Sequence, residues 1–172
     1  FCMPPGGPRQ FQLPYGVQFL EDREKKRIFV LVGSGNHNWR LIYTDGRSLK
    51  EDDKDFPTYY GRALAQWQGD TLVVDVTGFN TKTWLIGVGT VHSEKLRVTE
   101  RYTRDSYNTM LYRVTMDDPE VFTKPWNAEE TFRLRPGERI REYECIENNE
   151  DLLRIERLLK DESVFKRPAT NN

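Results

Sequence analysis

Three ionisable residues, His92, Glu94 and Glu100, fall on one face of a predicted strand. Side chains at positions i and i+2 share a face, and the apolar residues on this one are Leu96, Val98 and Tyr102. A carboxyl group inside a barrel loses its hydration, which raises its pKa and suits it to acid and base catalysis. The three residues therefore define a candidate site for a lyase, an isomerase or a hydrolase.

The same pattern has a structural explanation, which we favour. His92 and Glu94 would lie in water at the mouth of the barrel, and Glu100 would accept hydrogen bonds from an arginine. Other catalytic motifs are missing: residues 33–38 lack the third glycine of a dinucleotide loop, and the chain has no Gly-x-Ser-x-Gly sequence. We therefore assign no catalytic residue and expect no cofactor and no metal ion.

Aromatic side chains supply a second kind of candidate site. Small-molecule pockets and protein interfaces are both rich in aromatic residues. Trp84 and Trp126 are predicted to lie in loops, whereas Trp39 and Tyr43 alternate along a predicted strand. We expect these four residues to contact a ligand or a partner.

The two cysteines, Cys2 and Cys145, lie near opposite ends of the chain. They have neither Cys-x-x-Cys spacing nor nearby histidines, which argues against a zinc site. They are either two buried thiols or one disulfide, and a disulfide closing so long a loop would stabilise the fold by about 4–5 kcal/mol in the chain-entropy model. We favour the disulfide and, with it, an extracytoplasmic compartment.

Short strands must position these residues. About nine strands separated by turn signals occupy residues 15–149, and Asp45-Gly46 is typical of a hairpin turn. In the strand over 94–104 the side chains expected to point outward are Lys95, Arg97 and Arg101. Since consecutive hairpins favour a meander, and a closed meander exposes no edge, we predict an antiparallel meander that closes to a lipocalin-like β-barrel. A Greek-key sandwich is the alternative.

The ends of the chain differ from this central domain. Residues 1–14 are rich in proline and glycine and predict an extended arm. Residues 150–163 predict a C-terminal helix, with apolar residues at helical spacing: Leu152, Leu153, Ile155, Leu158 and Leu159. Residues 164–172 form a polar tail.

Composition limits the classes of protein to consider. The chain has 172 residues, with 26 basic and 27 acidic side chains, so its length fits one domain and its net charge is −1. Near-neutral charge argues against a general binder of nucleic acid or of anionic membranes. No apolar run approaches the roughly 20 residues of a membrane-spanning helix.

The order of short motifs along the chain carries a resemblance. These motifs are Cys2–Gly6, Tyr43–Arg47, Gly69–Asp75, Gly78–Asn80, His92–Glu94, Glu100-Arg101, Asp117–Pro119, Lys124–Trp126, Glu142-Tyr143 with Cys145, and Asn148-Asn149. The chain resembles a family of exported bacterial proteins, mostly described as hypothetical, over nearly the whole domain. The resemblance implies an exported protein whose signal peptide has been removed, and it implies no activity.

These features lead to one functional expectation with two alternatives. We expect a non-catalytic periplasmic module, an accessory or structural subunit that docks on a larger protein assembly, such as a membrane complex, through its irregular ends at residues 1–14 and 163–172. The alternatives are a barrel that binds a small apolar or aromatic ligand, and an acid/base enzyme that uses His92, Glu94 and Glu100.

Overall fold

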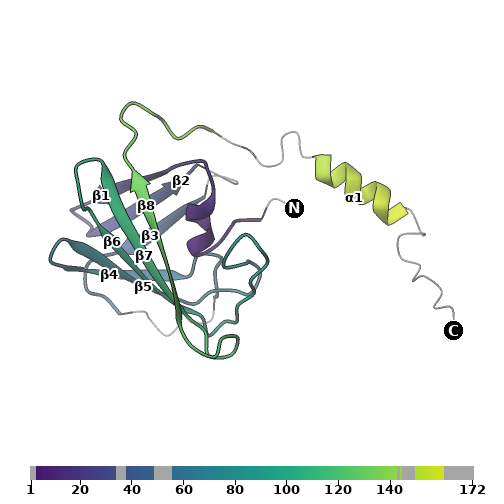
Figure 1. Ribbon diagram of the computed structural model, residues 1–172, viewed down its shortest axis with the longest axis horizontal. Helices are drawn as coiled ribbons and strands as arrows, with labels where there is room; N and C mark the ends of the chain where they lie inside the picture. The colour runs from purple at the N-terminus through teal and green to yellow at the C-terminus, as the bar shows by residue number, and fades with distance from the viewer. Residues whose placement is uncertain (1–2, 34–37, 49–55, 143, 145–149, 161–172) are drawn as a thin grey trace.

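The computed structural model describes residues 3–33, 38–48, 56–142, 144 and 150–160, and its strands form one curled β-sheet (Figure 1). The elements are η1 (Pro8–Gln12), β1 (Val17–Asp22), β2 (Arg27–Val32), β3 (Trp39–Tyr43), β4 (Arg62–Gln68), β5 (Thr71–Thr77), β6 (Arg97–Thr103), β7 (Thr109–Asp117), β8 (Trp126–Arg133) and α1 (Glu150–Lys160). The predicted barrel-like all-β fold with one C-terminal helix is confirmed. The described residues form eight strands rather than the nine expected.

The eight strands follow one another through the sheet in chain order, as a meander requires. One neighbouring pair departs from the predicted antiparallel pattern, because β3 and β4 run parallel and share two residue pairs, Ile42 with Ala63 and Tyr43 with Leu64. The hairpin expected at Asp45-Gly46 is therefore wrong. A parallel neighbour needs a long crossover, and residues 44–61 carry the chain back to the end of the sheet where β3 began.

The core lies inside the curl of the sheet and follows the alternation of each strand. Leu96, Val98 and Tyr102 are buried there, and the basic side chains of Lys95, Arg97 and Arg101 are exposed, so the predicted register is confirmed. Directly paired residues form rows across the sheet, one of which contains Val76, Val98, Met116 and Trp126. The side chains of one row all point to the same face of the sheet, so each inward-pointing row adds apolar surface to the core.

β1 and β8 form the two edges of the curled sheet. β8 was only partly anticipated: Trp126, predicted in a loop, is its first residue, and no strand is assigned to residues 134–142. Except for Trp126 and Phe132, the side chains of β8 are exposed. An edge strand has a neighbour on one side only, so its sequence need not show a clean apolar alternation.

The N-terminal segment is not the extended arm that its composition predicted. Pro8 begins the short 3-10 helix η1, consistent with the preference of proline for the first turn of a helix. Phe11 of η1 is buried against Tyr102, Tyr112 and Phe132, with ring centroids 6.2, 4.9 and 5.2 Å away. Residues 5–8 and Gln10 are buried together with Phe11, so this proline-rich segment is part of the core.

The helix α1 begins at the predicted residue and is drawn apart from the sheet (Figure 1). Among the described residues, this is the longest helix, and no helix is both long and apolar enough to cross a membrane. Cys2 and Cys145, as well as the polar tail at 164–172, lie outside the described residues. The disulfide therefore stays a prediction.

Candidate functional site

The carboxylate of Glu100 is held by an ion pair across the inside of the barrel. Arg40 on β3 donates from both terminal nitrogens, with 2.9 Å between Nη1 and Oε1, and Tyr112 on β7 donates its hydroxyl to Oε1 at 3.0 Å. Arg40 and Glu100 are 4% and 1% exposed. The expected structural pairing of Glu100 with an arginine is thus present, and an acceptor so fully used is poorly placed to take a proton from a substrate.

The electrostatics of this cluster keep Arg40 charged. Burial alone would lower the pKa of Arg40, but the negative charge of Glu100 raises that pKa above its ordinary value. Burial, followed by the charge of Glu100, also raises the pKa values of Tyr102 and Tyr112. Both phenols are therefore neutral at physiological pH, and they surround the ion pair without adding charge.

His92 and Glu94 do not join Glu100 in one site. The Nδ1 of His92 lies 3.1 Å from the Ser93 carbonyl, which can only accept, so Nδ1 carries the proton and Nε2 accepts from the hydroxyl of Thr83. Glu94 is exposed to solvent. Buried His92 thus has its own partners, and the candidate acid/base trio is divided between an interior ion pair, a packed imidazole and a solvated carboxylate.

A groove of about 480 Å³ opens where β3 and β4 pair over only two residues. Its lining residues are Trp39, Arg40, Leu41, Tyr43, Arg47, Thr58, Tyr60, Gly61, Arg62 and Ala63. Trp39 is 56% exposed and Arg40 is buried, so the groove leads from the outer face of the sheet to the interior ion pair. Its volume lies in the range of small-molecule sites.

The residues that line this groove include two, one on β3 and one just before β4, with a buried donor that makes no hydrogen bond to a described residue. The donors are Nε of Arg40 and the hydroxyl of Tyr60, whose pKa is raised by burial. Gly61 allows the chain to pass here: its φ is +65°, and a Cβ at this position would lie 2.7 Å from a methyl carbon of Val76. The local backbone therefore requires glycine.

The structure separates the four aromatic residues expected to make contacts. Trp39 and Tyr43 line the β3–β4 groove together. Trp84 is half exposed in its loop, with the guanidinium of Arg9 5.5 Å from its ring centre, and Trp126 packs edge-on against Phe122. Only the pair on β3 contributes to a cavity of ligand size.

Sequence reasoning missed Arg40 and Tyr60. Arg40 alternates in phase with Ile42, and a basic residue in phase with apolar ones signals a buried partner. Glu100 shows the same signal on β6, so the two could have been matched as an ion pair. Tyr60 precedes β4 in an irregular segment, and no periodicity marks it.

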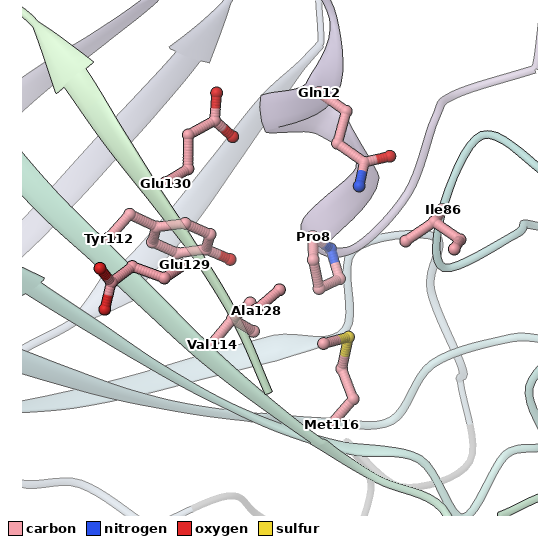
Figure 2. A pocket seen from close by; sticks show the side chains of 9 residues that line it. All are labelled: Pro8, Gln12, Ile86, Tyr112, Val114, Met116, Ala128, Glu129 and Glu130. Carbon is pink, nitrogen blue, oxygen red and sulfur yellow. The ribbon is translucent and has the colours of Figure 1, made fainter. Parts of the chain in front are cut away.

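A second, smaller pocket of about 90 Å³ lies between η1 and the inner faces of β7 and β8 (Figure 2). Pro8 and Gln12 of η1 face Val114 and Met116 of β7 there, with Ala128 on β8. The pocket is too small for most organic ligands, whose sites measure about 300–1,000 Å³. It is a packing gap beside an open sheet edge.

The amphipathic helix α1 exposes apolar side chains. Leu153, Leu158 and Leu159 are exposed, the last at 65%. Leu158 and Leu159 lie on the apolar side of the helix, whereas Leu153 is four and seven positions before Arg157 and Lys160 and shares their side. Among the described residues, no cluster of histidine and carboxylate side chains suits a metal ion.

Comparisons with protein-family models, with curated proteins and with solved structures found no match. Any functional assignment therefore depends on the residues and geometry described above.

Proposed function

We propose that this chain is a non-catalytic β-barrel module that docks on another protein and serves as an accessory or structural subunit of a larger assembly. The observation that carries the proposal is the exposed apolar face of α1. An eleven-residue helix is marginally stable by itself in water, and it gains stability when a packed neighbour covers its apolar face. Exposed leucines on such a helix are typical of an interaction surface.

The interior of the barrel supports the non-catalytic part of the proposal. Glu100 is used by Arg40 and Tyr112, and His92 by Thr83 and Ser93. Neither residue lines the β3–β4 groove or the pocket beside η1. An acid/base site needs its groups beside a space that a substrate can enter.

The docking element we propose differs from the ends expected from the sequence. Residues 8–12 are built into the core through Phe11, so this part of the N-terminal segment is not a free arm. Residues 163–172 lie outside the described part of the chain. The proposed docking surface is therefore the apolar face of α1, with Leu158 and Leu159 as its exposed contact residues.

The test compares a variant of the α1 leucines with a variant of two loop valines, each expressed in the cells that naturally produce the protein. One variant replaces Leu158 and Leu159 with glutamate, and its matched control places glutamate at Val88 and Val91, two loop residues that are 85% and 58% exposed against 42% and 65% for the leucines. Native electrophoresis of cell extracts should show the wild type in a species larger than the 20.3 kDa chain. The helix variant should run alone, and the loop variant should remain assembled. A wild-type chain that runs alone would overturn the proposal.

The proposed location is the periplasm of a bacterium, supported by the motif order and by the two cysteines. A Cys2–Cys145 disulfide would form in that oxidising compartment. Mass spectrometry after alkylation without reductant tests this directly, since a disulfide leaves neither thiol to alkylate. Two alkylated cysteines in the oxidised native protein would contradict the pairing.

A second candidate function is small-molecule binding, and the β3–β4 groove favours it. The groove combines aromatic walls, buried donors and a volume of about 480 Å³. These properties are typical of ligand sites in barrels. A binding role is compatible with docking, because the groove and α1 are different parts of the molecule.

A further inference from the structure

We propose that the β3–β4 groove binds a small aromatic carboxylate, with the carboxylate at Arg40 and Tyr60 and the ring against Trp39 and Tyr43. This inference rests on the second candidate function, ligand binding in the groove, and adds the chemical class of the ligand. Three properties of the groove support it: its unused donors, its aromatic walls and its rigid construction.

The unused donors define the polar end of the ligand. Arg40 is more than nine-tenths buried, and each of its terminal nitrogens donates one hydrogen bond to Glu100, so Nε is its nitrogen without a partner among the described residues. The hydroxyl of Tyr60 is the second buried donor beside the groove. Buried donors without partners are rare in folded proteins, and a carboxylate offers the two acceptor oxygens that this pair can use.

Among the described residues that line the groove, none carries a carboxylate. Three of them, Arg40, Arg47 and Arg62, carry a guanidinium group. Arg47 is held by Asp45 and lies with its guanidinium carbon 3.8 Å from the ring centre of Tyr43. The described lining thus offers a carboxylate three guanidinium groups, of which Arg40 and Arg47 are paired with Glu100 and Asp45 outside the lining, and no acidic side chain.

The aromatic walls define the other end of the ligand. Trp39 and Tyr43 both line the groove from β3 and have the same strand parity. An indole and a phenol on one face offer stacking surfaces to a planar ring. The exposure of Trp39 also leaves its ring accessible from solvent.

The groove is rigid before any ligand arrives. Glu100 fixes the Arg40 guanidinium through two hydrogen bonds, and the backbone beside Tyr60 passes so close to Val76 and Thr77 that a Cβ at Gly61 would clash with them. Donors held in place by the fold lose little conformational entropy on binding. A ligand-binding site gains affinity from donors that are already held in place, whereas a surface depression that binds nothing has no need of them.

The test is isothermal titration of the full chain with three probes: 1-naphthylacetate, 1-naphthylacetamide and acetate. The acid should bind with saturation, and the neutral amide should bind at least about tenfold more weakly because it loses the charge-assisted hydrogen bonds. Acetate lacks the ring and should show no binding up to about 5 mM.

Variants locate the binding to the groove. Trp39→Ala should weaken binding of the acid about tenfold or more, and Tyr60→Phe, which keeps the ring and removes one donor, about three- to tenfold. Trp67→Ala is the matched control, because Trp67 is 57% exposed against 56% for Trp39 and lies outside the lining. An unchanged Tm for each variant shows that the fold is retained.

Three results would overturn the proposal, and they have different meanings. Equal binding of acid and amide would overturn the carboxylate assignment and leave the groove as a ligand site. Equal losses in Trp39→Ala and Trp67→Ala would move the binding away from the groove. If no probe binds, both the inference and the ligand-binding candidate are wrong, and the docking proposal is untouched.

Discussion

The strand β7 has two neighbours, β6 and β8, and each places a glutamate on the inner face of the sheet. Glu100 on β6 is opposite Val114, and Glu130 on β8 is opposite Tyr112. Glu100 is buried and paired with Arg40, whereas Glu130 is exposed and has no ion pair among the described residues. The same residue type thus meets two environments within one layer of the barrel.

The difference follows from where the sheet ends. β6 is an interior strand whose inner face is covered, so a charge there requires a partner of opposite sign. β8 is an edge, where water solvates the carboxylate. Inward-pointing charges on edge strands also oppose the addition of a further strand, which protects an open sheet from aggregation. On the inner face of this sheet, a buried carboxylate therefore requires an interior strand and a counter-charge, as Glu100 has on β6 with Arg40.

The largest expected effect comes from breaking this buried pair. Glu100→Gln leaves the charge of Arg40 buried without a counter-charge and should lower the free energy of unfolding by about 3–5 kcal/mol. Urea denaturation measures the loss. Glu129→Gln, which breaks the exposed pair with Arg113, is the control and should cost less than about 1 kcal/mol.

A double substitution separates the loss of the pair from the cost of an orphaned charge. Arg40→Met with Glu100→Leu replaces both ions by apolar side chains and should recover a large part of the lost stability. If Glu100→Gln is as mild as Glu129→Gln, the two sides of β7 do not differ in the way described.

The second expected effect concerns Phe11, which packs against residues on both sides of β7. Phe11→Ala should cost about 3 kcal/mol, because its ring contacts Tyr102 on β6 and Phe132 on β8. Thermal unfolding measures the loss, with Phe56→Ala, at an exposed phenylalanine, as the control. A negligible effect would restore the initial expectation that residues 1–14 form an arm outside the core.

The interior strand β6 and the residues that it buries were predicted well from the sequence. Strict alternation over 94–104 predicted which side chains of β6 are buried, and it placed Glu100 among them. Alternation is reliable there because one face is packed and the other solvated. The identity of the partner was not predicted, since Arg40 lies 60 positions away and only the curl of the sheet brings the two together.

The edge strand β8 and the segment 8–12 were harder to predict, for two physical reasons. β8 reads Asn127-Ala-Glu-Glu-Thr131 in its middle, and a half-solvated edge strand leaves no apolar pattern to detect. In the segment 8–12, composition argued for extended backbone, but burial of the single Phe11 ring outweighed it. The β3–β4 groove was also beyond sequence reasoning, because it arises from a parallel pairing after a long crossover.

The third expected effect concerns Asp118, which fastens the segment before β6 to the end of β7. Its carboxylate accepts from the backbone N–H and the hydroxyl of Ser93, at 2.6 and 2.8 Å, and from the N–H of Glu120. Burial raises the pKa of Asp118, but these hydrogen bonds outweigh it and hold that pKa below its usual value. Asp118→Asn should cost about 1–2 kcal/mol at pH 7.

The pH dependence of that cost has a definite sign. A lowered folded-state pKa stabilises the protein fully above the unfolded value of about 3.9, and the stabilisation is lost as pH falls through the folded value. The difference between wild type and Asp118→Asn in urea unfolding should therefore shrink at about pH 3. Asp70→Asn, in the exposed turn after β4, is the control. A difference that persists unchanged at acid pH would show that the carboxylate charge is not responsible.

The smallest expected effect belongs to Glu130, and its sign is opposite to that of Glu100. Partial burial raises the pKa of Glu130, so the folded chain holds this proton more tightly than the unfolded chain does. Stability then falls as pH rises from about 4.3 through the folded value, and the ionised carboxylate is a slight cost at neutral pH. Glu130→Gln removes that cost. Because the side chain is largely solvated, the gain at pH 7 should be only a few tenths of a kcal/mol, or about 1–2 °C in Tm, and it should vanish near pH 4. A loss of about 1 kcal/mol or more would mean that Glu130, like Glu100, has a favourable partner, and that the two sides of β7 treat an inward carboxylate alike.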